Sequence, residues 1–301
     1  MVDGGMVEKV FRAFAKVNLF LKILGERSDG YTEIRTIFQT ITLFDTLSFI
    51  PILENDIKLE ICGEVKIPVG KENLIYKTAF LLKERFSVNR GIKIKLEKRI
   101  PTGAGLGGGS SNSAITLLAL NDLWGLNLSM EELCEIGSEL GSDVPFFLRG
   151  GSAFGFGRGN ELIFFPDGYF KIPQGELLLV VPDFKISTSW AYETYRRFLL
   201  TKEVDKNKIT CFYGGEIFFE NDFEKLLFKE YPVLLKLKNL LLNYGAKVCI
   251  ISGSGSVLFG VFHHLDSDTK ELIVAELPAK FRVLEAKFLS AKEYGNLIYK
   301  T

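Results

Sequence analysis

The chain has 301 residues, of which 47% are hydrophobic and 25% charged, a composition typical of a folded globular protein rather than a disordered one. Single hydrophobic cores stop growing near ~250–300 residues, so this length favours two domains. Lysine plus arginine and aspartate plus glutamate number 37 each, which leaves no overall positive field to hold a nucleic-acid backbone. We expect no nucleic-acid partner.

The cysteines and histidines exclude several kinds of site. The four cysteines are widely spaced, so neither a disulfide framework nor a zinc site is predicted: Cys62, Cys134, Cys211 and Cys249. The N-terminus lacks the basic and apolar segments of a signal peptide, and no apolar run approaches the ~18 residues that span a bilayer. We therefore expect a cytoplasmic protein with no membrane partner. The only histidines are the adjacent His263 and His264, so a general base should be Asp, Glu or Lys.

The first half of the chain reads as strands followed by helices. Strands are predicted over 7–24 and 33–50, separated by the turn-rich GERSDGY and stopping at Pro51, and over 91–100, where apolar residues alternate with lysines. Helices are predicted over 72–86, over 110–124, and from a capping box at Ser129 and Glu132 to about Gly141.

The second half also interleaves the two kinds of element. Strands are predicted over 177–181, 248–251 and 257–262, and helices over 189–200, 221–243 and 270–276. The fold class is therefore α+β with two layers in each domain. We place the domains at residues 1–160 and 161–301.

A glycine-rich loop joins the strand at 91–100 to the following helix. Five glycines lie in the stretch PTGAGLGGGSSN, residues 101–112. Glycine lets successive backbone N–H groups converge and lets phosphate oxygens approach closely. The N-terminus of the next helix adds unpaired N–H donors and a positive partial charge. This pattern predicts a phosphate-binding loop, as against a flexible linker or a bare turn.

Two other nucleotide signatures fit the loop less well. Gly103-x-Gly105-x-x-Gly108 satisfies the dinucleotide pattern, but the acidic residue expected about 20 residues later, after a second parallel strand, is matched only by Asp122 in the first helix. A Walker A loop needs Gly-Lys-Ser/Thr at the helix start, and this loop contains no lysine.

Four segments together resemble the GHMP kinases (galactose, homoserine, mevalonate and phosphomevalonate kinases). They are AKVNLFLKILGERSDGY (15–31), the glycine loop, GSDVPFF (141–147) and ISGSGS (251–256), which occur in the family's order. The resemblance implies a two-domain GHMP kinase-like fold whose C-terminal domain is a ferredoxin-like α/β sandwich. It also implies ATP with Mg²⁺, and phosphorylation of a small-molecule alcohol. The segments SDGY and GLGGGSSN favour the branch that phosphorylates the 2-hydroxyl of a cytidine diphosphate sugar alcohol for non-mevalonate isoprenoid synthesis.

The same resemblance implies the site residues. Asp143 would be the catalytic base and Lys16 its cationic partner. Substrate would be bound by Asn18, Tyr31, Thr32, Thr188, Tyr192, Gly253, Ser254 and Gly255. ATP would be bound by Asn73, Pro101, Thr102, Gly103, Ala104, Gly105, Leu106, Gly107, Gly108, Gly109, Ser110 and Ser111. The metal ligands stay open, with the Ser110 hydroxyl as one candidate.

The residues themselves support part of this assignment. Lys16 and Asn18 have the same parity in an extended strand, so both can face one cleft, and a cation beside Asp143 would keep that carboxylate ionised. Asp143 precedes Pro145, which we expect to hold the chain extended; the alternatives are an N-cap for Asp143 and a solvent-facing Lys16. The tyrosines could stack on a base or serve only in packing. Tyr195 is the competitor of Tyr192.

Thr32 stands where the family usually has histidine, which leaves pyrimidine recognition open. A mevalonate or homoserine kinase, a silent ligand-binding homologue and an NAD-dependent oxidoreductase are the alternative functions. Either a monomer or a homodimer fits the sequence.

Overall fold

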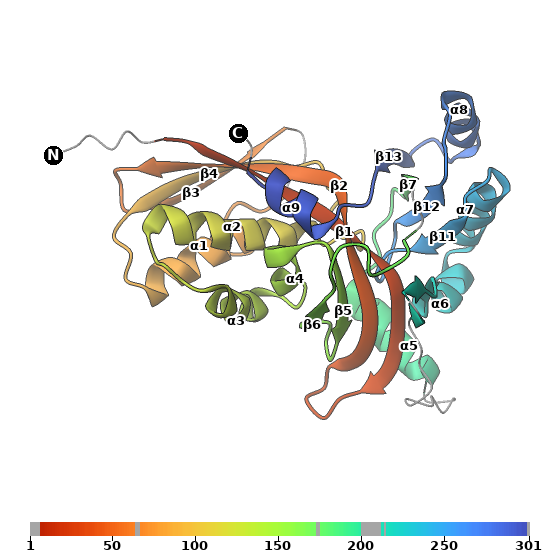
Figure 1. Cartoon of the computed structure of the whole chain (residues 1–301), viewed down its shortest axis with the longest axis horizontal. Helices are drawn as coiled ribbons and strands as arrows, with labels where there is room; N and C mark the ends of the chain where they lie inside the picture. Colours follow the sequence, from red (N-terminus) through yellow and green to blue (C-terminus); the bar gives the residue numbers. More distant parts are fainter. Residues whose placement is uncertain (1–6, 64–66, 173–174, 200–211, 214, 300–301) are drawn as a thin grey trace.

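The computed structural model describes residues 7–63, 67–172, 175–199, 212–213 and 215–299, which form two lobes side by side (Figure 1). The first lobe contains β1 (Lys9–Glu26), β2 (Thr32–Ile52), β3 (Ile57–Cys62), α1 (Leu74–Arg85), β4 (Gly91–Glu97), α2 (Gly108–Trp124), α3 (Met130–Leu140), α4 (Val144–Arg149), β5 (Ser152–Phe156) and β6 (Glu161–Phe164). The rest of the chain forms β7 (Glu176–Val181), α5 (Thr188–Leu199), β8 (Phe212–Tyr213), β9 (Glu216–Ile217), β10 (Glu220–Asn221), α6 (Phe223–Glu230), α7 (Pro232–Asn243), β11 (Val248–Ile251), β12 (Leu258–Phe262), α8 (Ser267–Glu276), β13 (Arg282–Ala286) and α9 (Ala291–Leu297).

The first sheet is built around two long antiparallel strands, β1 and β2. The strand order is β10-β1-β2-β4-β3, and the β5–β6 hairpin pairs with β2. Helices α1 to α4 pack on this sheet around a core that includes Phe14 and Phe49 of the strands and Leu117 and Phe146 of the helices. The strand β2 does not stop at Pro51 as predicted but continues to Ile52, still paired with β4. On its other side β1 begins at Lys9, opposite Phe49, so no residue of β1 pairs with Pro51. Proline can occupy a strand where no ladder hydrogen bond is required of its nitrogen.

The second sheet is antiparallel with the order β11-β12-β7-β13. With α5 to α7 between β7 and β11, and α8 between β12 and β13, this is the ferredoxin-like arrangement that the resemblance implied. Residues of β7 alternate between two cores. Leu178 and Val180 pack on the helices, while Leu177 and Leu179 pack against Val17 of β1 and other residues of the first lobe. The lobes therefore share a hydrophobic core.

The chain crosses between the lobes more than once. The predicted boundary at residue 160 falls between β5 and β6, which pair with each other in the first sheet; we propose the division after Phe164. The terminal helix α9 returns to the first lobe (Figure 1), where Tyr294 donates a hydrogen bond to the Phe147 carbonyl.

The remaining predicted elements are confirmed with two corrections. The single helix expected over 221–243 is two helices, α6 and α7, because Pro232 follows a break at Tyr231. The segment after Asp143 is not extended, since Pro145 lies in the first turn of α4, where proline is tolerated. The end of the predicted helix at Leu200 and the cysteine Cys211 lie outside the described residues.

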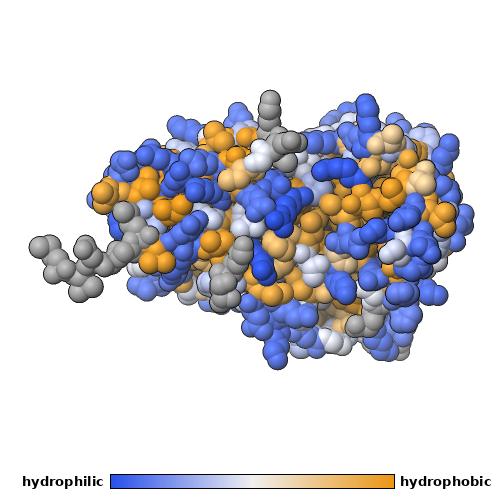
Figure 2. All heavy atoms as spheres, turned by 90° about the horizontal axis from the view of Figure 1, so that it is seen from above, coloured by the Kyte–Doolittle hydropathy of each residue, from blue (hydrophilic) through white to orange (hydrophobic). Residues whose placement is uncertain are grey.

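The surface is mixed in character. Figure 2 shows hydrophilic side chains spread among hydrophobic ones over the face that it presents, in keeping with the balanced charge of the chain. Within the described ranges, no helix is long and apolar enough to cross a membrane.

Candidate active site

A cavity of about 470 Å³ lies between the lobes and is lined by residues of both. The glycine loop, α2 and Asp143 come from the first lobe, and Thr188, Gly253 and Ser254 come from the second. Most of the predicted site residues meet here: Lys16, Asn18, Asn73, every residue from Pro101 to Ser110, Asp143, Thr188, Tyr192, Gly253 and Ser254. Segments 238 residues apart in sequence thus face one another across a single cleft.

The glycine loop ends on the N-terminus of α2. Gly107 is the N-cap in a left-handed conformation with φ 69°, and no side chain of the described residues caps the helix. The first turn also contains no acidic residue. Its N–H groups and the positive end of the helix dipole are thus presented to the cavity, an arrangement that suits an anion.

Two of the glycines are required by packing of the protein on itself. A Cβ on Gly105 would lie 2.0 Å from the Ser252 carbonyl oxygen, and one on Gly107 would lie 2.7 Å from the Phe147 ring. Both residues also have positive φ. By contrast, a Cβ on Gly109 would meet only Leu74, at an ordinary 3.6 Å. Close approach by phosphate can therefore explain Gly109, whereas Gly105 and Gly107 fix the loop against its neighbours.

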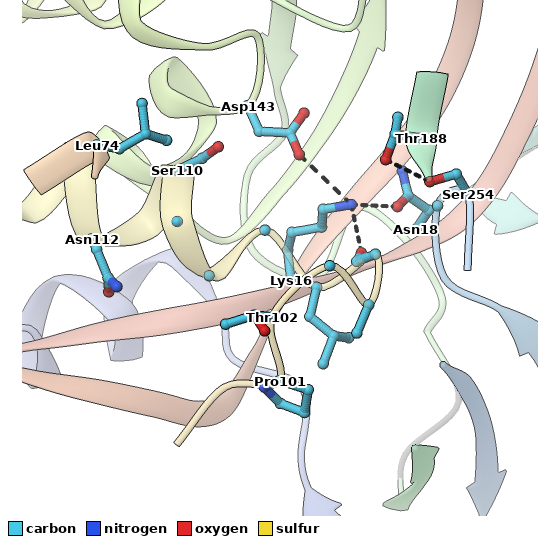
Figure 3. Close-up of a pocket in the computed structure, with 18 of the residues that line it drawn as sticks. Lys16, Asn18, Leu74, Pro101, Thr102, Ser110, Asn112, Asp143, Thr188 and Ser254 are labelled. Carbon is cyan, nitrogen blue, oxygen red and sulfur yellow. Dashed lines mark hydrogen bonds and ion pairs between the residues drawn. The ribbon is translucent and has the colours of Figure 1, made fainter. Parts of the chain in front are cut away.

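Lys16 lies at the foot of this loop and is 4% exposed. Its Nζ donates to Asn18 Oδ1 at 2.6 Å and to the Gly105 carbonyl at 2.9 Å, and lies 3.7 Å from Asp143 Oδ2 (Figure 3). Burial lowers the pKa of the Lys16 ammonium, and the Asp143 carboxylate opposes that shift. Lys16 and Asn18 do face the same cleft, as their parity predicted.

Asp143 is the N-cap residue of α4, but its side chain makes no capping hydrogen bond. The carboxylate instead faces Lys16 and the cavity, with 30% of the side chain exposed (Figure 3). An acceptor that is both paired with a buried cation and open to the cavity can take a proton from a bound hydroxyl.

The second lobe supplies hydroxyls and a ring opposite Asp143. The hydroxyls of Thr188 and Ser254 are 3.0 Å apart. The Tyr192 ring lines the cavity and packs edge-on against Phe223, with ring centroids 4.9 Å apart. Burial, with a smaller effect of the Asp143 charge, raises the pKa of Tyr192, so this phenol stays neutral. Its competitor, Tyr195, is buried among apolar residues of the second lobe.

Four predicted residues do not line the cavity. Ser111 is fully buried in α2, and Gly255 lies against Ile186, whose side chain would be 3.2 Å from a Cβ on that glycine. Tyr31 is 54% exposed in the turn between β1 and β2, and Thr32 begins β2. The Tyr31 ring contacts Arg158, which does line the cavity and whose guanidinium carbon lies 4.4 Å from the ring centroid.

Several cavity residues were not assigned from sequence. Among them are Arg158, Asn112 and Lys98. Ser252 does not line the cavity, but its hydroxyl donates to the Gly105 carbonyl at 2.9 Å. The sequence signals were present: Asn112 ends the glycine loop, Arg158 lies between two glycines, and Ser252 adjoins Gly253. The Asn112 side-chain oxygen is buried and has no hydrogen-bond partner among the described residues.

The donor set fits ATP better than it fits a metal cage. The uncapped helix and the open position at Gly109 suit an anion. The unpartnered Asn112 oxygen is an acceptor and suits a donor of the nucleotide, such as a ribose hydroxyl or the adenine amino group. No group of three or more His, Cys, Asp or Glu side chains that could hold a metal ion occurs in the described part of the chain. Mg²⁺ usually keeps water and substrate-phosphate ligands and needs only one or two protein groups, so this set does not conflict with Mg²⁺.

Comparisons with known proteins identify the class. Family models described as the GHMP kinases N terminal domain and the GHMP kinases C terminal match residues 73–151 and 214–283. A relative from Solibacter usitatus is 43% identical over 95% of this chain and 90% of its own length. A second, from Thermoanaerobacter pseudethanolicus, is 40% identical over 85% of this chain and 88% of its own. The chain belongs to the GHMP kinase family and is a small-molecule kinase.

Both of those relatives are named 4-diphosphocytidyl-2-C-methyl-D-erythritol kinase. A crystal structure of 4-(cytidine 5'-diphospho)-2C-methyl-D-erythritol kinase superposes with a TM-score of 0.73 at 32% identity, covering 94% of this chain and 99% of that one. A homoserine kinase from Cytophaga hutchinsonii has a TM-score of 0.63 at 15% identity over 97% and 98% of the two chains, which shows a shared fold alone.

Proposed function

We propose that this protein transfers the γ-phosphoryl group of ATP to the 2-hydroxyl of 4-diphosphocytidyl-2-C-methyl-D-erythritol, a step of non-mevalonate isoprenoid precursor synthesis. This proposal is supported by relatives that are named as that kinase and are 40–43% identical over 85–95% of this chain. We further expect it to act in the cytoplasm, as a monomer or a homodimer.

The observation that carries the proposal is the pair of Lys16 and Asp143 at the foot of the glycine loop. Phosphoryl transfer needs the two substrates in line, neutralisation of charge and a base for the hydroxyl proton. In our proposal Asp143 takes that proton as the hydroxyl oxygen attacks the γ-phosphorus and the bond to the ADP oxygen breaks. Lys16, held by Asn18 and the Gly105 carbonyl, lies 3.7 Å from the carboxylate and offsets the charge that develops on the acceptor oxygen.

ATP would lie along the glycine loop with its phosphates at the start of α2. The loop residues 101–111 and Asn73 are the proposed contacts, Asn73 being the N-cap of α1 beside the cavity. Mg²⁺, held mainly by phosphate oxygens with Ser110 as the candidate protein ligand, would neutralise triphosphate charge. Ser110 lies in the first turn of α2 and its side chain is drawn on the same side as Asp143 (Figure 3).

The second substrate would occupy the opposite end, between the lobes. Asn18, Thr188, Gly253 and Ser254 line that part of the cavity and offer amide and hydroxyl groups to the diphosphate and sugar alcohol. Tyr192 offers a ring to the cytosine, and aromatic rings stack on any nucleobase. Tyr31, Thr32 and Gly255 are proposed as outer contacts, with Arg158 between Tyr31 and the cavity.

A coupled assay of ADP release tests the proposal. We expect ATP-dependent turnover with 4-diphosphocytidyl-2-C-methyl-D-erythritol, and product phosphorylated at the 2-hydroxyl by NMR. Turnover only with mevalonate or homoserine would move the protein to another branch of the family. Binding of ATP without turnover of any of the three would instead indicate a silent homologue. Binding of NADH in preference to ATP would favour the alternative function of an NAD-dependent oxidoreductase.

A further inference from the structure

A buried ion pair lies behind the phosphate-binding loop and is absent from the family-derived set of site residues. Asp45 of β2 is 0% exposed, and Lys98, just after β4, has a side chain that is 3% exposed. The Lys98 ammonium lies 2.7 Å from Asp45 Oδ2. Two charges removed from water at this depth incur a large desolvation cost, which their mutual attraction often fails to offset.

Asp45 fixes the path of the chain from β4 into the glycine loop. The β2–β4 ladder ends at the pair Thr46 and Glu97. Beyond that pair, the backbone N–H groups of Arg99 and Ile100 both donate to Asp45 Oδ1, at 2.7 and 2.8 Å. One carboxylate oxygen thus replaces the strand partner that the two amides lack, immediately before Pro101 begins the loop.

The second carboxylate oxygen places Lys98 beside the loop's other end. The Lys98 ammonium donates to the Ile100 carbonyl as well as to Asp45. A Cβ on Gly108, the first residue of α2, would lie 3.1 Å from that nitrogen. Lys98 also lines the active-site cavity. A single aspartate therefore sets both the entry to the loop and the position of a cation at its exit.

We infer that Asp45 is a positioning residue for the phosphate donor, acting through the backbone of Arg99 and Ile100 and through Lys98. It holds the loop in its anion-binding form before the nucleotide arrives, which reduces the ordering that binding requires. The inference rests on the proposed function only in taking ATP as the ligand of this loop.

The chemistry of the pair offers a substitution that separates its two tasks. Asp45→Asn keeps an oxygen for the two backbone amides but turns an NH₂ group toward the Lys98 ammonium, so only the lysine contact is lost. Lys98→Met removes the cation and leaves Asp45 bound to the backbone. Glu224→Gln is the matched control, because Glu224 also accepts from a lysine, Lys238 at 2.6 Å, and from a backbone amide, that of Ile251 at 3.1 Å.

Calorimetric titration of the full chain with a non-hydrolysable ATP analogue, and separately with the cytidine substrate, provides the test. We expect Asp45→Asn to weaken analogue binding about tenfold or more, as for loss of one charge-assisted contact. Substrate binding should stay unchanged, and in the turnover assay KM for ATP should rise more than kcat falls. Lys98→Met should give a similar loss, and the double variant one smaller than the sum of both, because the residues act together.

The outcomes distinguish the inference from a structural role and from the proposed function. Unchanged analogue affinity in folded Asp45→Asn, losses that add in the double variant, or equal losses for both ligands would overturn it. If Asp45→Asn fails to fold, Lys98→Met decides alone, and unchanged analogue affinity or equal losses for both ligands would then overturn the inference. Glu224→Gln should lower the midpoint of thermal unfolding and leave analogue affinity intact; equal weakening there would also count against Asp45. Absence of turnover in the wild type would overturn the function but leave the analogue titrations valid.

Discussion

The two walls of the active-site cleft are assembled in different ways. The ATP wall is nearly continuous in sequence, since residues 101–110 form the loop and the first turn of α2. The opposite wall is collected from β1, from the start of α4, from α5 and from the loop between β11 and β12. A continuous wall depends on local backbone geometry, whereas a collected wall depends on the packing of the lobes. Substitutions should therefore affect the two walls by different routes.

The largest effect is expected at Asp143, on the collected wall. Asp143→Ala should lower kcat on the order of 10²-fold or more, typical for loss of a general base, with ATP affinity largely kept. The side chain caps no helix, so the fold should tolerate the change. Steady-state kinetics and calorimetry with ATP measure the two effects. Unchanged turnover would remove Asp143 from its proposed role.

The prediction for Asp143 shows how far the sequence could lead. The motif GSDVPFF locates the aspartate, but the sequence alone predicts an extended chain after it, because Pro145 is expected to hold the chain extended. Proline in the first turn of a helix is compatible with the short α4, and only tertiary packing distinguishes the two cases. Asp143 faces Lys16 because α4 packs against α2 and α3, which no local pattern encodes.

Other contacts were equally beyond local reading. The glycine loop could be predicted because strand, glycines and helix are adjacent in the chain. The tie from Ser252 to Gly105 joins residues 147 apart, and that from Asp45 to Ile100 joins residues 55 apart. Periodicity predicted a strand at 91–100. It could not predict that the backbone amides of Arg99 and Ile100 donate to the side chain of Asp45. The order of the predicted elements was enough to predict the fold class. The split between α6 and α7 could have been predicted only by treating Pro232 as the start of a new helix.

The second largest effect is expected at Gly105, where the two walls touch. Gly105→Ala would place a methyl group against the Ser252 carbonyl at a residue with φ 78°. We expect a loss of about 2–5 kcal/mol in the free energy of unfolding, from backbone strain plus overpacking. Urea unfolding measures it. Gly109→Ala is the control: it adds a methyl with room and should keep stability, so any loss of ATP affinity there reports direct approach of the phosphates.

A smaller effect is expected at Ser252, the hydrogen bond between the walls. Its hydroxyl donates to the Gly105 carbonyl, which also accepts from Lys16. Ser252→Ala should cost about 0.5–1.5 kcal/mol of stability and lower kcat/KM severalfold, since the carbonyl that orients Lys16 loses a partner. Ser256→Ala is the matched control, because Ser256 is equally buried but donates to the Phe184 carbonyl. If both variants lose the same activity, the tie has no special role.

The smallest effect concerns the pH dependence of stability at Lys16. Burial lowers its pKa below the ordinary 10.5. Between that lowered value and 10.5 the unfolded chain binds more protons than the folded chain, so the contribution of Lys16 to the free energy of unfolding rises with pH. Lys16→Met should remove this rise, by about 1.4 kcal/mol for each pKa unit of lowering. The check is urea unfolding of both proteins from pH 8 to 10. If the free energy of unfolding of the wild type, relative to that of Lys16→Met, falls as the pH rises, the pKa of Lys16 is raised rather than lowered. The attraction of the Asp143 carboxylate would then exceed the effect of burial.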